Sequence, residues 1–115
     1  MDKKLIYIAG ALSGSTTDYI SNVSKMIKHA EKIRRLGFAV YIPCLDILQG
    51  IVMGDMIMSD YFDNSFAILS RCDAVSLTPG WENSNGTKLE IEEADSRNIP
   101  VLETWGDLLN FALTL

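Results

Sequence analysis

The chain has 115 residues, of which 48% are apolar and 22% charged, and its formal net charge is −5. This composition is typical of one folded domain spanning residues 1–115 and excludes a disordered chain. The acidic balance disfavours a nucleic-acid polymer as the partner, because a phosphate backbone is bound by clustered lysine and arginine side chains.

The apolar runs and the cysteines bear on where the protein works. No apolar run approaches membrane-spanning length, and no signal peptide precedes the first predicted strand. The two cysteines, Cys44 and Cys72, are too few for a disulfide framework and lack the spacing of metal ligands. We therefore expect a cytoplasmic protein that uses no membrane, metal ion or other cofactor.

The N-terminal third predicts a βαβ unit. Residues 5–9 (LIYIA) are a short apolar run typical of a buried parallel strand, and a loop of small side chains follows. An amphipathic helix comes next and ends at Gly37, before a second strand at residues 38–42. The apolar side chains at helical spacing, which we expect to be buried, are Ile20, Val23, Ile27, Ala30 and Ile33.

The polar side of this first helix carries a cluster of basic residues. Such a cluster favours a solvated face over a binding patch, and we expect the single histidine, His29, to face solvent there as well. The cluster consists of Lys25, Lys28, Lys32, Arg34 and Arg35.

The remainder of the chain alternates between helices and strands. Residues 45–58 have no clear period and predict a loop with a short irregular helix. The later predicted elements are a helix at 59–71, a strand at 74–78, a helix at 87–98, a strand at 99–102 and a helix at 105–115. This alternation predicts a single doubly wound α/β domain, flavodoxin- or Rossmann-like in three layers, with a mainly parallel sheet of four to five strands.

The polar loop between the third strand and the following helix is the first candidate for a site. Ligands of open parallel sheets bind outside the carboxyl ends of the strands. Glu90 falls in the first turn of the predicted helix, where the helix dipole favours an ionised carboxylate. Two alternatives stand beside this interpretation: Thr87 and Glu90 fit a capping box, and Trp81 fits a surface anchor of the loop.

The loop after the first strand is the second candidate. Gly10, Ser13 and Gly14 would allow a phosphate to approach backbone N–H groups and the N-terminus of the next helix. The loop matches neither a GxGxxG fingerprint nor a P-loop, so a tight turn that needs glycine is an equal alternative. A serine nucleophile would need a base nearby, and His29 is not placed to supply one.

Taken together, these residues resemble the nucleoside 2-deoxyribosyltransferase-like superfamily, in particular its small phage and bacterial members. In chain order the resemblance is carried by residues 7–10 (YIAG), residues 72–75 (CDAV), residues 77–84 (LTPGWENS), and Gly86, Glu90 and Ala94 in the pattern GxxxExxxA. The stretch from Pro79 to Glu90 is specific, whereas the N-terminal glycine is not.

The resemblance implies cleavage of the N-glycosidic bond of a deoxynucleoside or its monophosphate, by hydrolysis or by transfer of the sugar. Glu90 aligns with the nucleophilic glutamate of the superfamily. The resemblance also implies a homo-oligomer that binds a small-molecule nucleoside or nucleotide, with a 5′-phosphate or sugar hydroxyl held by the first loop and Ser84. The substrate-binding residues that we expect on this basis are Tyr7, Gly10, Ser13, Gly14, Trp81, Ser84, Asn85 and Gly86.

Two positions depart from the superfamily pattern. Relatives carry a second acid where this chain has Ser65, and the transferases carry a glycine where it has Lys88. A serine cannot supply the negative charge that would assist protonation of the base. A second hypothesis is therefore a catalytically inactive nucleotide-binding module in which Glu90 only caps its helix. A third is an oligomeric scaffold that uses the apolar segment 45–58 as an interface.

Overall fold

The computed structural model describes residues 3–12, 16–45, 52–54 and 58–114. These residues form one sheet, whose strands all run parallel in the order β2-β1-β3-β4. The predicted parallel α/β sheet is confirmed, while most of the irregular helix expected at 45–58 lies outside the described residues. The strands are β1 (Leu5–Ala9), β2 (Ala39–Tyr41), β3 (Ala74–Leu77) and β4 (Val101–Leu102).

The sheet is doubly wound around β1 and β3. The chain runs from β1 to its neighbour β2 at one edge, returns to β3 on the other side of β1, and then reaches β4. The direction of winding therefore reverses between β1 and β3. In folds of this kind the ligand sits at that reversal, outside the carboxyl ends of the strands.

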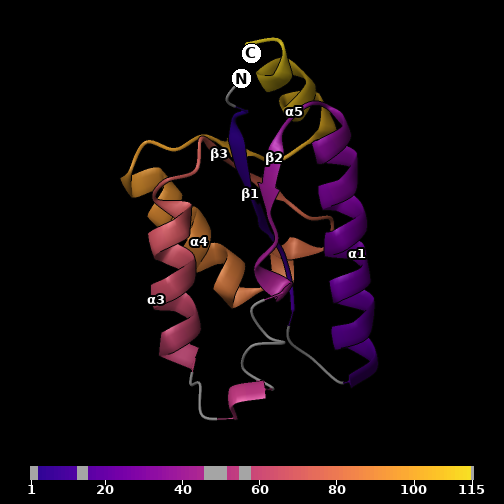
Figure 1. Cartoon of the computed structure of the whole chain (residues 1–115), viewed down its shortest axis with the longest axis vertical. Coiled ribbons are helices and arrows are strands. Elements are labelled where there is room, and N and C mark those ends of the chain that lie inside the picture. The colour runs from indigo at the N-terminus through magenta and orange to yellow at the C-terminus, as the bar shows by residue number, and fades with distance from the viewer. Residues whose placement is uncertain (1–2, 13–15, 46–51, 55–57, 115) are drawn as a thin grey trace.

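Helices cover both faces of the sheet (Figure 1). One face carries α1 (Thr16–Arg35) and α5 (Trp105–Ala112), and the other carries α3 (Met58–Leu69) and α4 (Asn85–Ser96). Two short 3-10 helices, η1 (Pro43–Leu45) and η2 (Trp81–Asn83), follow β2 and β3. No helix of the described residues is both long and apolar enough to cross a membrane.

The two halves of the core follow the alternation of side chains along β1. Ile6 and Ile8 join the cluster beneath α1 and α5, whereas Tyr7 and Ala9 join the cluster beneath α3 and α4. All four side chains are fully buried. Because neighbouring residues of a strand point to opposite faces, Tyr7 is directed toward the layer that contains α4.

The buried face of α1 differs from the predicted one. Ile20 and Ile27 are 62% and 41% exposed, so the expectation that they are buried is wrong. Met26 takes their place, 1% exposed, together with Ala30 and Ile33. Residues 23, 26, 30 and 33 keep helical spacing, and the flexible methionine side chain fills the space above β1.

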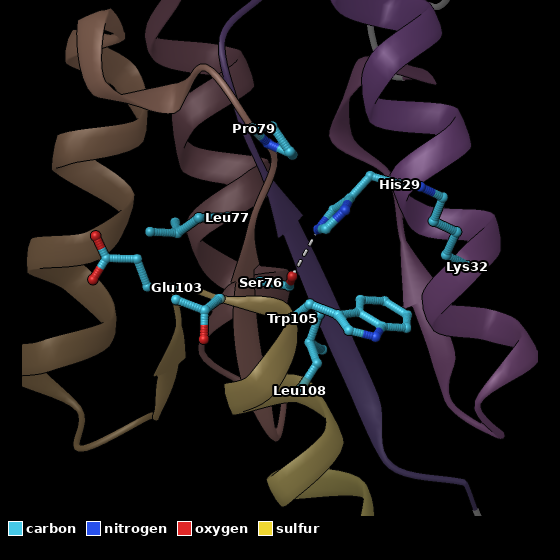
Figure 2. Close-up of a pocket in the computed structure, with 9 residues that line it drawn as sticks. His29, Lys32, Ser76, Leu77, Pro79, Glu103, Trp105 and Leu108 are labelled. Carbon is cyan, nitrogen blue, oxygen red and sulfur yellow. Dashed lines mark hydrogen bonds between the residues drawn. The ribbon is translucent and has the colours of Figure 1, made fainter.

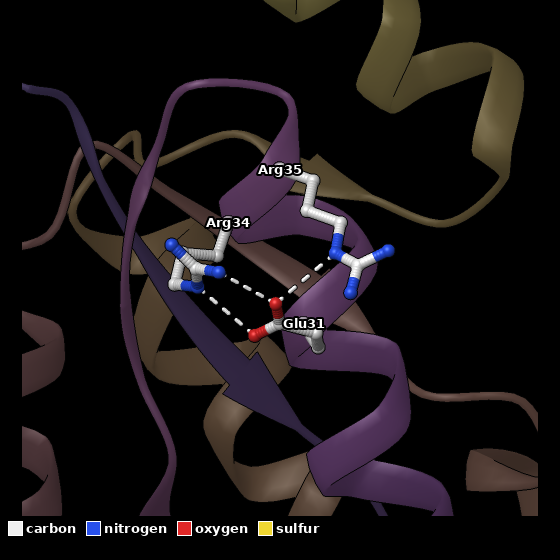
Figure 3. Close-up of polar contacts among 3 residues, drawn as sticks. All are labelled: Glu31, Arg34 and Arg35. Atoms are coloured by element: carbon white, nitrogen blue, oxygen red, sulfur yellow. Dashed lines mark hydrogen bonds and ion pairs between the residues drawn. The ribbon is translucent and has the colours of Figure 1, made fainter.

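The basic cluster of α1 is solvated, as predicted, because all five of its members are exposed. Two of them form ion pairs with Glu31 (Figure 3), Arg34 at 2.6 Å and Arg35 at 3.1 Å. Hydrogen bonds from Arg34 and Arg35 lower the pKa of Glu31 to about 2. The end of the helix is also as predicted, since Gly37 has a φ of 105° just beyond it.

Candidate functional site

A cavity of about 630 Å³ opens at the carboxyl end of β1, beside the N-terminus of α4 and against α3. Its volume lies within the roughly 300–1,000 Å³ of small-molecule sites. Because it lies at the end of β1, the cavity is at the point where the sheet reverses its winding, between β1 and β3. The lining residues are Tyr7, Gly10, Leu12, Tyr19, Pro43, Tyr61, Phe62, Ser65, Asn83, Ser84, Asn85, Gly86, Thr87, Leu89 and Glu90.

Glu90 lies in the wall of this cavity, but not in the first turn of its helix. Because α4 begins at Asn85, Glu90 belongs to the second turn, and the predicted effect of the helix dipole on it is wrong. The capping box is wrong as well, since the N-cap is Ser84, whose Oγ accepts a hydrogen bond from the Thr87 N–H at 3.2 Å. The Glu90 side chain is 8% exposed and accepts a hydrogen bond from the Tyr7 hydroxyl.

The electrostatics of the Tyr7–Glu90 pair are set by burial. Removal from water raises the pKa of Glu90 to about 7, while the hydrogen bond from Tyr7 pulls it down. The pKa of Tyr7 is strongly raised, first by burial and then by the charge and hydrogen bond of Glu90, whereas a hydrogen bond from Ser65 lowers it. Glu90 is thus poised to change protonation near neutral pH, contrary to our expectation that it ionises readily.

Ser65 stands with this pair on the third side of the cavity. It belongs to α3, is 7% exposed, and lines the cavity beside Tyr7 of β1 and Glu90 of α4. A hydrogen bond that lowers the pKa of a phenol stabilises the phenolate, which can only accept, so the Ser65 hydroxyl donates to Tyr7. Tyr7 in turn donates to Glu90. Ser65, the position at which the resemblance led us to expect a second acid, therefore contacts the same network.

The loop before α4 supplies polar groups to the rim. Ser84, Asn85 and Gly86, which we expected to contact a substrate, line the cavity. Ser84 is 7% exposed, and its Oγ also accepts a hydrogen bond from the Thr87 hydroxyl at 2.9 Å. The Ser84 hydroxyl proton remains available for donation, so this residue fixes the start of α4 and can contact a ligand.

The first loop reaches the cavity through Gly10, while Ser13 and Gly14 lie outside the described residues. A Cβ atom on Gly10 would come within 2.7 Å of Thr78 Cβ and 3.3 Å of Met26 Cε. Glycine is needed here for the close approach of the β1 and β3 ends. The adjacent Thr78 hydroxyl is buried and has no hydrogen-bond partner among the described residues.

Trp81 is not part of the cavity wall. Its side chain packs against the core cluster beneath α3 and α4, so the alternative of a loop anchor describes it. Sequence reasoning missed Tyr19, Tyr61 and Phe62, which line the cavity from α1 and α3. Apolar periodicity along a helix does not distinguish a core contact from a cavity wall.

Comparison with family models identifies the chain over residues 4–103, as "Domain of unknown function (DUF4406)". The chain belongs to the DUF4406 family. Comparison with curated proteins and with solved structures yields no match. The DUF4406 match contains all the described residues that line the cavity beside Glu90, and it ends just before α5.

A second cavity, of about 400 Å³, lies on the opposite face of the DUF4406 fold, between α1 and α5 (Figure 2). His29 points from α1 toward β3 and hydrogen-bonds the fully buried Ser76 at 2.9 Å, so the prediction of a solvent-facing histidine is wrong. Burial, and secondarily the charge of Lys32, lower the pKa of His29. Among the described residues, no group of three His, Cys, Asp or Glu side chains could hold a metal ion.

Proposed function

We propose that the protein cleaves the N-glycosidic bond of a deoxynucleoside or deoxynucleoside monophosphate, with Glu90 as the nucleophile. The observation that carries the proposal is the Glu90 carboxyl group, which is buried in the wall of a 630 Å³ cavity at the carboxyl end of β1. A carboxyl group held there faces a ligand space instead of its own backbone.

The chemistry that suits this group is a two-step displacement. In the first step a Glu90 oxygen attacks the anomeric carbon through an oxocarbenium-like state, and the base departs with the electron pair of the glycosidic bond. In the second step water attacks the same carbon and releases the sugar, which regenerates the carboxylate. A second base in place of water would give transfer.

The network behind Glu90 supports this role. Tyr7 donates to Oε2 of Glu90, which restricts the carboxyl group and leaves its other oxygen for attack. Ser65 donates in turn to Tyr7. Three elements, β1, α3 and α4, thus converge on one carboxyl group, an arrangement typical of a positioned reactive group.

The rim of the cavity offers contacts for the sugar. Ser84, Asn85 and Gly86 lie at the N-terminus of α4, where backbone N–H groups and the Ser84 hydroxyl can donate to a sugar hydroxyl or a phosphate. Gly10 lines the cavity at the end of β1 as well. The homo-oligomer suggested by the resemblance is part of this proposal.

The competing function is a nucleotide-binding module without catalysis. The observation that favours it is the serine at position 65, because a second carboxyl group is missing from the described part of the cavity wall. In that case the cavity binds a nucleotide, and the only role of Glu90 is to accept the hydrogen bond from Tyr7.

Release of free base separates the two functions. The protein is incubated with each common deoxynucleoside and its 5′-monophosphate, and free base is measured by chromatography. We expect release that disappears in Glu90→Gln and persists in Glu92→Gln, an exposed acid of the same helix. Binding without release from any substrate supports the module, and the absence of both supports a scaffold.

A further inference from the structure

The cavity beside Glu90 combines a buried carboxyl group with an aromatic wall. Tyr19 of α1 and Tyr61 and Phe62 of α3 line it, and each of these side chains is half-buried. The face of an aromatic ring attracts a cation through its quadrupole, and a desolvated carboxylate attracts one through its charge. Cages of aromatic rings are a common way to recognise N-alkylated cations.

The charges around the cavity act in the same direction. Glu90 is the one acidic residue among the described lining residues, and that set contains no lysine or arginine. This charge distribution favours a cationic ligand over an anionic one.

The leaving group gives an independent reason. A neutral base departs as an anion unless an acid protonates it. In the network around Glu90 the Tyr7 proton is engaged by Glu90, burial further weakens Tyr7 as an acid, and the hydroxyl of Ser65 is no substitute for a carboxyl group. The phenols of Tyr19 and Tyr61, elsewhere in the described wall, are weaker acids than a carboxyl group. A base that already carries a positive charge leaves as a neutral molecule and needs no acid.

We propose that the substrate of this cavity is a nucleoside whose base is a cation, such as an N7-alkylated purine or an N-glycosylated pyridinium. This inference rests on the proposed glycosidic cleavage and names its substrate class. The aromatic wall and the Glu90 carboxylate bind the charged base, and the polar rim at Ser84 contacts the sugar.

The reaction balances without a proton donor. An ionised Glu90 oxygen forms a bond to the anomeric carbon, and the glycosidic C–N bond breaks. The electron pair of that bond neutralises the base, and water then adds to the anomeric carbon while one proton is lost to solvent. The products are a neutral base, a free sugar, a proton and the regenerated Glu90 carboxylate.

Binding of a cation also activates the nucleophile. A positive charge beside Glu90 stabilises its carboxylate and lowers the pKa from about 7, so the substrate itself favours the reactive form. Among the described residues, the other titratable groups that line the cavity are the phenols of Tyr7, Tyr19 and Tyr61. The charged side chains of Asp63 and Lys88, on the two packed helices, are exposed.

The test compares 7-methyl-2′-deoxyguanosine with 2′-deoxyguanosine, two substrates that differ in the charge of the base. Release of each base is measured against Glu90→Gln, which reports the spontaneous reaction of the labile cation. We expect kcat/KM to be at least about 100-fold higher for the cation, the smallest usual effect of a general acid. Equal or faster cleavage of 2′-deoxyguanosine overturns the cation preference alone. Release of base from neither of these two substrates nor from any common deoxynucleoside or its 5′-monophosphate overturns the glycosidic function.

A binding measurement tests recognition apart from chemistry. At pH 8 we expect the 1-methylnicotinamide cation to bind at least about 10-fold tighter than neutral nicotinamide, with the difference shrinking at pH 6 as Glu90 becomes protonated. Phe62→Leu should weaken binding of the cation about 5-fold. Phe66→Leu, the same change in a neighbouring ring outside the cavity wall, should leave it unchanged. Equal affinity for the two molecules at pH 8 overturns the inference.

Discussion

Glu90 is divided between its protonated and ionised forms at neutral pH, because burial raises its pKa to about 7. Only the ionised form can attack the anomeric carbon. For an uncharged deoxynucleoside substrate we expect kcat/KM to rise about tenfold per unit below pH 7 and to level off above it. Measurement of base release from pH 5 to pH 9 checks this, and a flat profile between pH 6 and pH 8 contradicts it.

Tyr7 influences the midpoint of this pH profile. Its hydrogen bond lowers the pKa of Glu90, so Tyr7→Phe should move the midpoint of the profile to higher pH. Tyr61→Phe removes another phenol from the cavity wall, and the midpoint should stay near 7. An equal shift of the midpoint in both variants would mean that a general change in the cavity, and not the loss of the Tyr7 hydrogen bond, moves the pKa of Glu90.

The same carboxyl group imposes a cost on folding that depends on pH. The unfolded chain releases the Glu90 proton near its ordinary pKa of 4.5, whereas the folded chain keeps it until about pH 7. Stability is therefore lost as the pH rises from 4.5 to 7, by up to about 3 kcal/mol. Glu90→Gln should remove this loss, so its free energy of unfolding relative to the wild type should be higher at pH 8 than at pH 4.5. Urea unfolding at both pH values measures the difference, and an unchanged pH dependence contradicts the prediction.

At the scale of elements, α4 depends on Ser84 in two ways. The Ser84 Oγ caps the helix at the Thr87 N–H and also accepts the hydroxyl of Thr87, which is fully buried. Ser84→Ala should cost the cap, about 1 kcal/mol, and a further 1–3 kcal/mol, roughly, for the orphaned hydroxyl. Urea unfolding measures the total.

The N-cap of α5 gives the matched comparison. Thr104 caps that helix through a capping box with Asp107, and both residues lie outside the Glu90 cavity. Thr104→Ala should therefore cost about 1 kcal/mol. Similar losses in the Ser84 and Thr104 variants would show that the bond to the Thr87 hydroxyl contributes little.

The start of α4 also shows where sequence reasoning reaches its limit. The strand, loop and helix around Glu90 were predictable from apolar runs and from Pro79 and Gly80. The register of the cap was not, because Thr87 and Glu90 satisfy the capping-box pattern as well as Ser84 satisfies an N-cap. The partner of Glu90 is Tyr7, 83 residues away, and no local pattern specifies that contact.

At the scale of the whole molecule, the alternation of strands and helices was sufficient to predict the three layers. Which residue of a helix meets which strand was not predictable, because that depends on how the layers pack. His29 illustrates this: a rotation of α1 by about one residue separates a solvated histidine from one bonded to Ser76, 47 residues away. The same uncertainty exchanged Ile27 for Met26 in the core.

His29 and Glu90, two titratable groups on opposite faces of the sheet, give the folded chain opposing responses to pH. The pKa of His29 is lowered from 6.5, so the unfolded chain takes up the histidine proton first, and stability is lost as the pH falls below 6.5. Glu90 acts in the reverse direction, since its contribution is lost as the pH rises from 4.5 to 7. Between pH 5 and pH 6.5 the two effects partly cancel.

Separating the two contributions requires one variant on each face. Urea unfolding is measured at pH 5, 6, 7 and 8 for the wild type, His29→Gln, Glu90→Gln and the double variant. For each variant the difference in free energy of unfolding from the wild type is compared between pH 5 and pH 7. This difference should be more favourable at pH 5 for His29→Gln and less favourable at pH 5 for Glu90→Gln. Because the chain has a single histidine, its NMR titration reports the His29 pKa directly. A wild-type pH dependence retained in His29→Gln, or a His29 pKa at or above 6.5, contradicts the assignment.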